Sequence, residues 1–118
     1  MSFEITEKLD VQTVILRLEG YFSQDAGKVL QKHVENLLHQ KFMFFVIDFS
    51  NCSSINSPGA AALLDTTMLI VEDFRGAVVL SGLKPLAAAL LSMVGVIPPA
   101  MTAANVEEGL KALPPSKV

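Results

Sequence analysis

The hydrophobic and polar positions of this chain change from a strand-like to a helix-like periodicity several times. Residues 3 to 8 and 11 to 19 interleave apolar and polar side chains, and LDVQ between them leaves room only for a tight turn. We expect an antiparallel hairpin there, with Gly20 closing its second strand. Residues 42 to 50, FMFFVIDFS, are almost continuously apolar, which is typical of a central strand covered on both faces.

Helical spacing marks the segments between these strands. Ser23 stands where an N-cap residue is expected, and five apolar side chains behind it share one helical face: Val29, Leu30, Val34, Leu37 and Leu38. A second helix is expected from about 58 to 74. A third should cover 84 to 95, with Pro85 in its first turn and Gly95 at its end.

The remaining segments complete an alternating pattern. Strands are expected over 76 to 82 and, weakened by its prolines, over VIPPAMT, and a short helix over 105 to 113. The order β-β-α-β-α-β-α-β-α predicts an α/β protein with a mixed sheet, in which a leading antiparallel hairpin precedes alternating strands and about four helices. We expect one domain over 1 to 118, with a core over about 3 to 113 and a frayed tail over 114 to 118.

Composition narrows the classes of function. The chain of 118 residues is 51% hydrophobic, and its mean hydropathy of +0.46 is high for a soluble protein. Lys84-Pro85 and two glycines nevertheless break the longest apolar run, residues 77 to 97, into pieces shorter than the ~18 residues of a spanning helix. The N-terminus lacks the basic and apolar regions of a signal peptide. We therefore expect a cytoplasmic protein without direct membrane insertion.

Charge and cysteine content point the same way. The formal net charge is −3 and no basic stripe is present, which argues against nucleic acid as a partner. The single cysteine, Cys52, allows no internal disulfide, and no spacing of metal ligands occurs. No Gly-rich phosphate loop is present either, so we expect neither a metal nor a cofactor.

The stretch SSINSPGAAALLD, residues 53 to 65, leads from the central strand into the second helix. Ser57 suits the N-cap and Pro58 the first helical position, so Ser57 has an ordinary structural role available. A helix N-terminus also tolerates a phosphate, because its N–H groups and partial positive charge favour an anion. Phosphorylation of Ser57 would then add about −1.5 to −2 charge without unfolding the helix.

The second helix has an unusual outer face. At 100° per residue, its core side carries Ala60, Leu63, Leu64, Thr67, Ile70, Val71 and Phe74. The opposite stripe holds small residues, one leucine and two acids: Pro58, Ala61, Ala62, Asp65, Leu69 and Glu72. Two interpretations stay open, namely surface alanines of high helix propensity and a docking face for another protein.

The segments VIDFSNCSSINSPGAAALL and SGLKPLAAALLSMVGV, in this order of elements, resemble the STAS domain, and within it the stand-alone anti-sigma factor antagonists. Asp48 and Ser50 match the family's strand end, and four residues match its helix start: Ile55, Asn56, Ser57 and Gly59. The resemblance implies a non-enzymatic protein that binds an anti-sigma factor, itself a serine kinase of the GHKL type, and thereby frees a sigma factor. It further implies that the kinase phosphorylates Ser57 to break the complex and that a serine phosphatase restores it.

The partner is expected to contact the helix start and the outer stripe: Asn56, Ser57, Pro58, Gly59, Ala61, Ala62, Asp65, Leu69 and Glu72. The protein itself should be a monomer or a weak homodimer. Asn56 replaces the family's usual acid, and Pro58, which lacks a backbone N–H that a phosphate could use, replaces a small residue. The alternative hypothesis is therefore a non-phosphorylated STAS scaffold, or a subunit of a signalling or lipid-transport complex.

Enzymatic chemistry has little support in the sequence. Ser57 lies in INSPG rather than in a G-x-S-x-G elbow, and His33 and His39, six residues apart, do not share a helical face. We expect Cys52 to be a small apolar filler, because no Lys, Arg or His lies nearby in sequence to lower the pKa of its thiol. Asp48 is expected to order the loop over 50 to 56 through backbone N–H groups.

Overall fold

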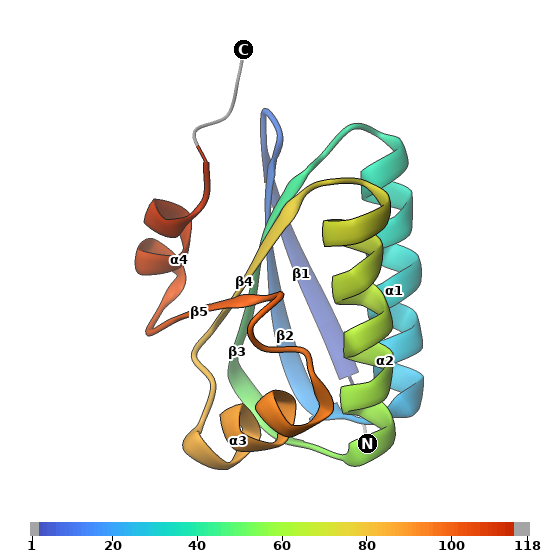
Figure 1. Ribbon diagram of the computed structural model, residues 1–118, viewed down its shortest axis with the longest axis vertical. Coiled ribbons are helices and arrows are strands. Elements are labelled where there is room, and N and C mark those ends of the chain that lie inside the picture. The colour runs from blue at the N-terminus through green and yellow to red at the C-terminus, as the bar shows by residue number, and fades with distance from the viewer. Residues whose placement is uncertain (1–2, 115–118) are drawn as a thin grey trace.

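A five-stranded sheet forms the centre of the computed structural model, which describes residues 3 to 114 (Figure 1). The strands, in their order across the sheet, are β1 (Phe3–Asp10), β2 (Thr13–Phe22), β3 (Phe44–Ile55), β4 (Ala77–Ser81) and β5 (Met101–Ala103). β1 and β2 are antiparallel, and each later strand runs parallel to its neighbour. The expected α/β mixed sheet with a leading hairpin is therefore confirmed.

The helices lie on both faces and at one end of the sheet. Figure 1 shows α1 (Gln24–His39) and α2 (Ser57–Met68) side by side on one face and α4 (Val106–Ala112) on the other. α3 (Pro85–Val94) lies at the end where the parallel strands finish. The main core fills the space beneath α1 and α2, and a smaller apolar cluster under α4 centres on Val46, Val79 and Leu113.

Local signals place the ends of two helices as expected. The Ser23 hydroxyl accepts a hydrogen bond from the Ala26 N–H at 3.2 Å and caps α1. Gly95 ends α3 with a φ of +94°, a left-handed conformation that glycine adopts without strain. Gly20 does not close its strand, however: β2 continues to Phe22, and its pairing with β3 becomes irregular at Gly20 and Tyr21.

β3 is longer than the apolar run that predicted it. It continues through the polar residues after Asp48 to Ile55, because β2 stays paired with it as far as Phe22. Its pairing with β4 ends at Asp48 and Ser81. Asp48 and Ser50 therefore do not mark the end of this strand, but the point where it loses one of its two neighbours.

The helix expected over 58 to 74 is two segments. α2 ends at Met68, and a π-helical segment, η1 (Leu69–Asp73), follows it. The Phe74 N–H bonds to the Leu69 carbonyl at 3.1 Å, which closes a turn one residue longer than an α-helical one. Residues after Met68 are therefore rotated relative to a continuous α-helix.

No helix within residues 3 to 114 combines the length and apolarity needed to cross a membrane. Four of the five residues of the expected frayed tail, 115 to 118, lie outside the described residues.

Candidate functional site

The start of α2 is built one residue earlier than expected. The Asn56 side chain, not that of Ser57, accepts the hydrogen bond from the Gly59 N–H, at 2.7 Å, so Asn56 is the N-cap. The expectation that Ser57 caps this helix is therefore wrong. Asn and Ser are comparable N-cap residues, and here the extended backbone of β3 reaches far enough to place Asn56 at the cap.

This shift leaves the Ser57 hydroxyl exposed in the first turn of α2, with no hydrogen bond to another described residue. Close packing behind Ser57 holds the turn in place. Gly59 is buried, and a Cβ added there would lie 2.3 Å from the carbonyl oxygen of Phe22. The Asn56 N–H also bonds to that oxygen, at 3.3 Å. The turn is therefore fixed to the end of β2 while Ser57 faces outwards.

Few backbone donors remain free beside Ser57. Pro58 has no N–H, Gly59 donates to the Asn56 side chain, and Ala60 donates to the Asn56 carbonyl at 2.9 Å. Of the first four residues of α2, only Ser57 itself keeps an N–H without a partner in the described chain. A phosphate there would gain from the helix dipole but would remain largely in solvent.

The outer stripe of α2 is smaller than expected. Pro58, Ala61, Asp65 and Glu72 are exposed, but Ala62 is only 7% exposed and packs against Gly27 of α1. Its placement on the outer face is wrong, because α1 approaches α2 closely at a position where it has no side chain. Leu69 is also misplaced: it is half-buried against the main core, where the π-helical turn begins.

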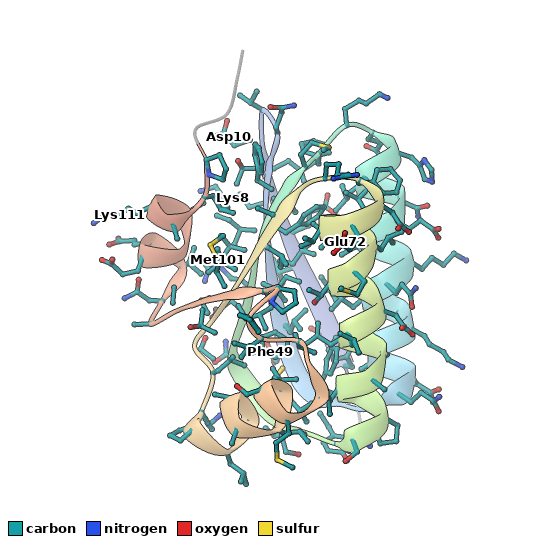
Figure 2. All side chains as sticks on the ribbon, viewed as in Figure 1. Lys8, Asp10, Phe49, Glu72, Met101 and Lys111 are labelled. Carbon is teal, nitrogen blue, oxygen red and sulfur yellow. The ribbon has the colours of Figure 1, made fainter. Side chains whose placement is uncertain are left out.

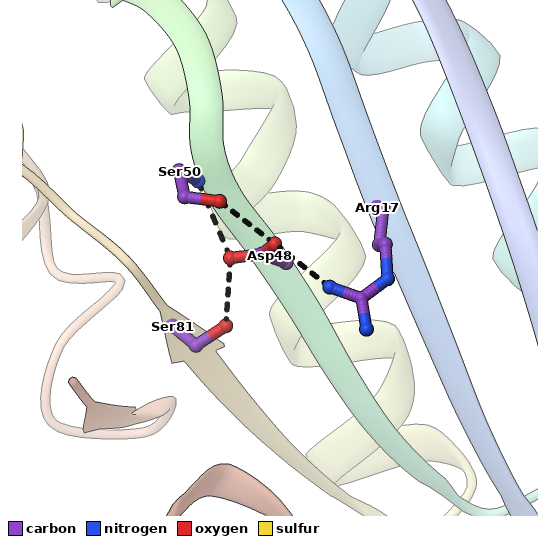
Figure 3. A network of polar contacts seen from close by, with 4 residues as sticks. All are labelled: Arg17, Asp48, Ser50 and Ser81. Carbon is purple, nitrogen blue, oxygen red and sulfur yellow. Dashed lines mark hydrogen bonds and ion pairs between the residues drawn. The ribbon is translucent and has the colours of Figure 1, made fainter. Parts of the chain in front are cut away.

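Asp48 joins three neighbouring strands (Figure 3). One carboxylate oxygen accepts from the Ser81 hydroxyl at 3.1 Å and the Ser50 N–H at 3.3 Å. The other accepts from the Ser50 hydroxyl at 2.9 Å and lies 3.3 Å from Arg17 Nη1. Asp48 thus accepts from a backbone N–H at Ser50, but the expected loop over 50 to 56 is wrong, because residues 50 to 55 belong to β3. The other partners of Asp48 include residues on β2 and β4. These contacts favour a structural role at the point where β3 and β4 separate.

Cys52 is buried, as expected of an apolar filler, and lies in the main core. Burial raises the pKa of its thiol from 9.0 to about 11, opposed by the nearby Lys84 ammonium and reinforced by Asp48. The Lys84 ammonium donates to the Cys52 carbonyl at 3.0 Å. The sequence did not show that Lys84 lies beside Cys52, because the two residues are 32 positions apart. Lys84 lowers the pKa of the thiol less than burial raises it, so the thiol is not made reactive.

Two surface depressions were not expected from the sequence. One lies between α3 and the last residues of β3. The apolar run of α3, with Leu86 and Met93 two turns apart, is the sequence feature that could have indicated it. The other, of about 440 Å³, is polar and lies beside Arg17, Asp48 and Asn105. Within the described part of the chain, no cluster of three or more His, Cys, Asp or Glu side chains could hold a metal ion.

Comparison with known proteins shows the fold. No family model and no curated protein sequence matches this chain, but solved structures do. The Bacillus cell fate determinant SpoIIAA in its phosphorylated form is 22% identical to this chain, with a TM-score of 0.69. The match covers 93% of this chain and 97% of the SpoIIAA chain. An anti-sigma factor antagonist from Mycobacterium paratuberculosis is 13% identical to this chain, with a TM-score of 0.79. That match covers 95% of this chain and 94% of the Mycobacterium chain.

A third match comes from the stressosome, which is described as a signal integration and transduction hub. Its chain is 25% identical with a TM-score of 0.65, and the match covers 92% of this chain and 93% of that one. The resemblance to stand-alone STAS domains that the sequence indicated is therefore confirmed at the level of the fold.

Proposed function

We propose that this chain is an anti-sigma factor antagonist that acts by partner switching, with Ser57 as its phosphorylated residue. The observation that carries the proposal is the position of Ser57, whose hydroxyl is exposed at the start of α2 and free of the capping role that Asn56 fills. A kinase could modify this hydroxyl without breaking a hydrogen bond of the fold. Among the structures with this fold, SpoIIAA is known in unphosphorylated and phosphorylated forms.

Phosphorylation would change the surface more than the fold. The phosphate adds about −1.5 to −2 charge beside a face that already exposes Asp65 and Glu72. Because few backbone donors are free at this turn, most of the new charge would face an approaching partner. We therefore expect a partner with an acidic contact surface to be repelled while the free protein stays folded.

The proposal includes the partners that such a switch requires. They are an anti-sigma factor that is also a GHKL-type serine kinase and a serine phosphatase that reverses the modification. The chain would act in the cytoplasm as a single STAS domain over 1 to 118, without catalysis or a cofactor of its own, as a monomer or a weak homodimer. The partner would contact the start of α2, its exposed stripe and the following π-helical segment: Asn56, Ser57, Pro58, Ala61, Asp65 and Glu72. Gly59, which was also expected to contact the partner, is buried against the end of β2 and is left out.

The test uses the purified chain with GHKL-type kinases from the same genome. Each kinase is incubated with the chain and ATP, and the product is mapped by mass spectrometry. We expect one phosphate on Ser57, absent in Ser57→Ala and present in Ser54→Ala, since Ser54 is an exposed serine two residues before the cap. A phosphate on another residue, or none with a kinase that binds the chain, contradicts the switch.

The second candidate is a STAS scaffold or a subunit of a larger signalling or lipid-transport complex that is not phosphorylated. Pro58, which removes a donor beside Ser57, favours it, and so does the similarity to a stressosome chain. This candidate predicts that Ser57→Ala and Ser57→Asp both bind the partner as the unchanged protein does. The switch predicts that only Ser57→Asp loses binding, measured by pull-down with each kinase.

A further inference from the structure

An apolar groove lies between α3 and the end of β3. It has a volume of about 390 Å³, and Ile55 lines it from β3 while Ala87 and Leu90 line it from α3. Figure 1 shows α3 at the same end of the sheet as the start of α2. Small-molecule sites typically have volumes of about 300 to 1,000 Å³, so the groove is large enough for a small ligand.

Two large apolar side chains at this groove are left in water. Leu86 is 86% exposed and Met93 is 85% exposed, whereas no other exposed large hydrophobic residue in the described chain exceeds 56%. They lie two helical turns apart, with Leu90 between them on the same side of α3. An apolar ligand lying along α3 would cover both side chains, and the free energy gained would grow with the area removed from water.

A much smaller cavity adjoins the groove. This cavity, of about 20 Å³, shares Ile55, Lys84 and Ala87 with the groove and reaches Phe49 and Cys52. Figure 2 shows Phe49 in the interior, between the sheet and α3. This cavity has room for about one water-sized group, so a hydrocarbon chain would lie in the groove along α3 and not in the cavity.

Lys84 supplies the only charge among the residues that line the groove and the cavity. Its ammonium donates one hydrogen bond to the Cys52 carbonyl at 3.0 Å, which holds it against β3. An ammonium has three N–H donors, so two remain for an anion at the rim. No carboxylate lines either space to compete for them.

We propose that this groove binds a free medium-chain fatty acid, with its hydrocarbon chain along α3 and its carboxylate at Lys84. The volume suits one chain rather than the two of a phospholipid, and the single cation matches the single charge of the head. The groove reaches Ile55, two residues before Ser57, but this proposal does not rest on phosphorylation of Ser57, and the two are tested by different measurements, so either can fail without the other.

The test follows octanoate and decanoate, each below its micelle concentration, by amide chemical shifts of the labelled full chain. We expect saturable shifts confined to residues 53 to 55 and 83 to 93, and about tenfold tighter binding for the two extra methylenes. Octan-1-ol should bind at least fivefold more weakly than octanoate. Unsaturable or scattered shifts, or equal binding of octanol and octanoate, overturn the proposal.

Variants on the exposed surface separate this site from general hydrophobic adsorption. Met93→Glu should weaken decanoate binding at least tenfold, whereas Leu110→Glu, at an exposed apolar position of α4, should leave it unchanged. Lys84→Gln should remove the preference for octanoate over octanol, and Lys84→Arg should keep it. Equal losses in the two glutamate variants refute the site. Reversible dimerisation of the unmodified chain that Leu86→Glu abolishes would instead assign the groove to a second copy.

Discussion

The close approach of α1 and α2 depends on the missing side chain at Gly27. A Cβ added there would lie 2.5 Å from the Cβ of Ala62, far inside the roughly 3.5 to 4.0 Å at which two carbon atoms are in favourable contact. Overpacking of this kind costs about 1 to 3 kcal/mol, and replacing a helical glycine returns about 1 kcal/mol. We expect Gly27→Ala to lower the free energy of unfolding by about 1 kcal/mol.

The reverse change at Ala62 should cost more. Ala62→Gly loses about 1 kcal/mol of helix propensity and about 0.8 kcal/mol from one buried methyl group, a total near 2 kcal/mol. In the double variant the methyl group moves from α2 to α1 without the clash. Its nearest neighbours would be the Gly59 carbonyl oxygen at 3.5 Å and the Cα of residue 62 at 3.7 Å, which are ordinary contacts.

We therefore expect the double variant to unfold within about 0.5 kcal/mol of the unchanged protein, although the single changes sum to about 3 kcal/mol. Urea denaturation of the four proteins gives the coupling energy directly. Ala61→Gly is the matched control, since Ala61 is exposed on the same helix and should lose only its propensity. Single effects that add within about 0.5 kcal/mol would refute this account of the packing.

Three further predictions concern buried groups. Leu69→Lys should lower the free energy of unfolding by about 1 to 2 kcal/mol, because Leu69 packs against the main core. A melting temperature equal to that of the unchanged protein would show instead that Leu69 lies on the surface. Thr67→Val should raise the free energy of unfolding by about 1 kcal/mol in urea, since the buried Thr67 hydroxyl has no hydrogen-bond partner among the described residues; a loss of stability would point to a partner. The raised pKa of the Cys52 thiol, about 11 against an ordinary value of 9.0, means that the unfolded chain releases this proton first as pH rises. The folded state should therefore lose about 2 kcal/mol as pH passes from 9 to 11, and urea denaturation across this range should show a smaller loss in Cys52→Ala.

The order of elements could be predicted because each is specified locally. The alternation of the hairpin, the continuous apolar run of β3 and the caps at Ser23 and Gly95 lie within a few residues of the feature they determine. The first residue of α2, in contrast, could not be predicted from local sequence. Asn56 and Ser57 are adjacent residues that both suit an N-cap, and the length of β3, which decides between them, depends on pairing with β2.

The face of α2 could not be predicted from α2 alone. Ala62 is buried because Gly27, 35 positions earlier, lets α1 approach, and Leu69 turns inwards where the π-helical turn begins. Lys84 reaches Cys52 because β3 and the chain after β4 lie next to each other. The contacts of Ala62 and Lys84 join residues that are distant in sequence, and the π-helical turn at Leu69 breaks the regular α-helical spacing, so helical periodicity contains none of this information.

The two outer strands affect how this protein behaves at high concentration. Any open row of backbone N–H and C=O groups can recruit the edge of another molecule and begin an aggregate. β5 offers only three residues for such pairing, and β1 carries four charged side chains along its eight residues: Glu4, Glu7, Lys8 and Asp10. Stacking two copies of β1 would bring several carboxylates together, so we expect the sheet to resist growth by edge-to-edge addition even where the chain is crowded.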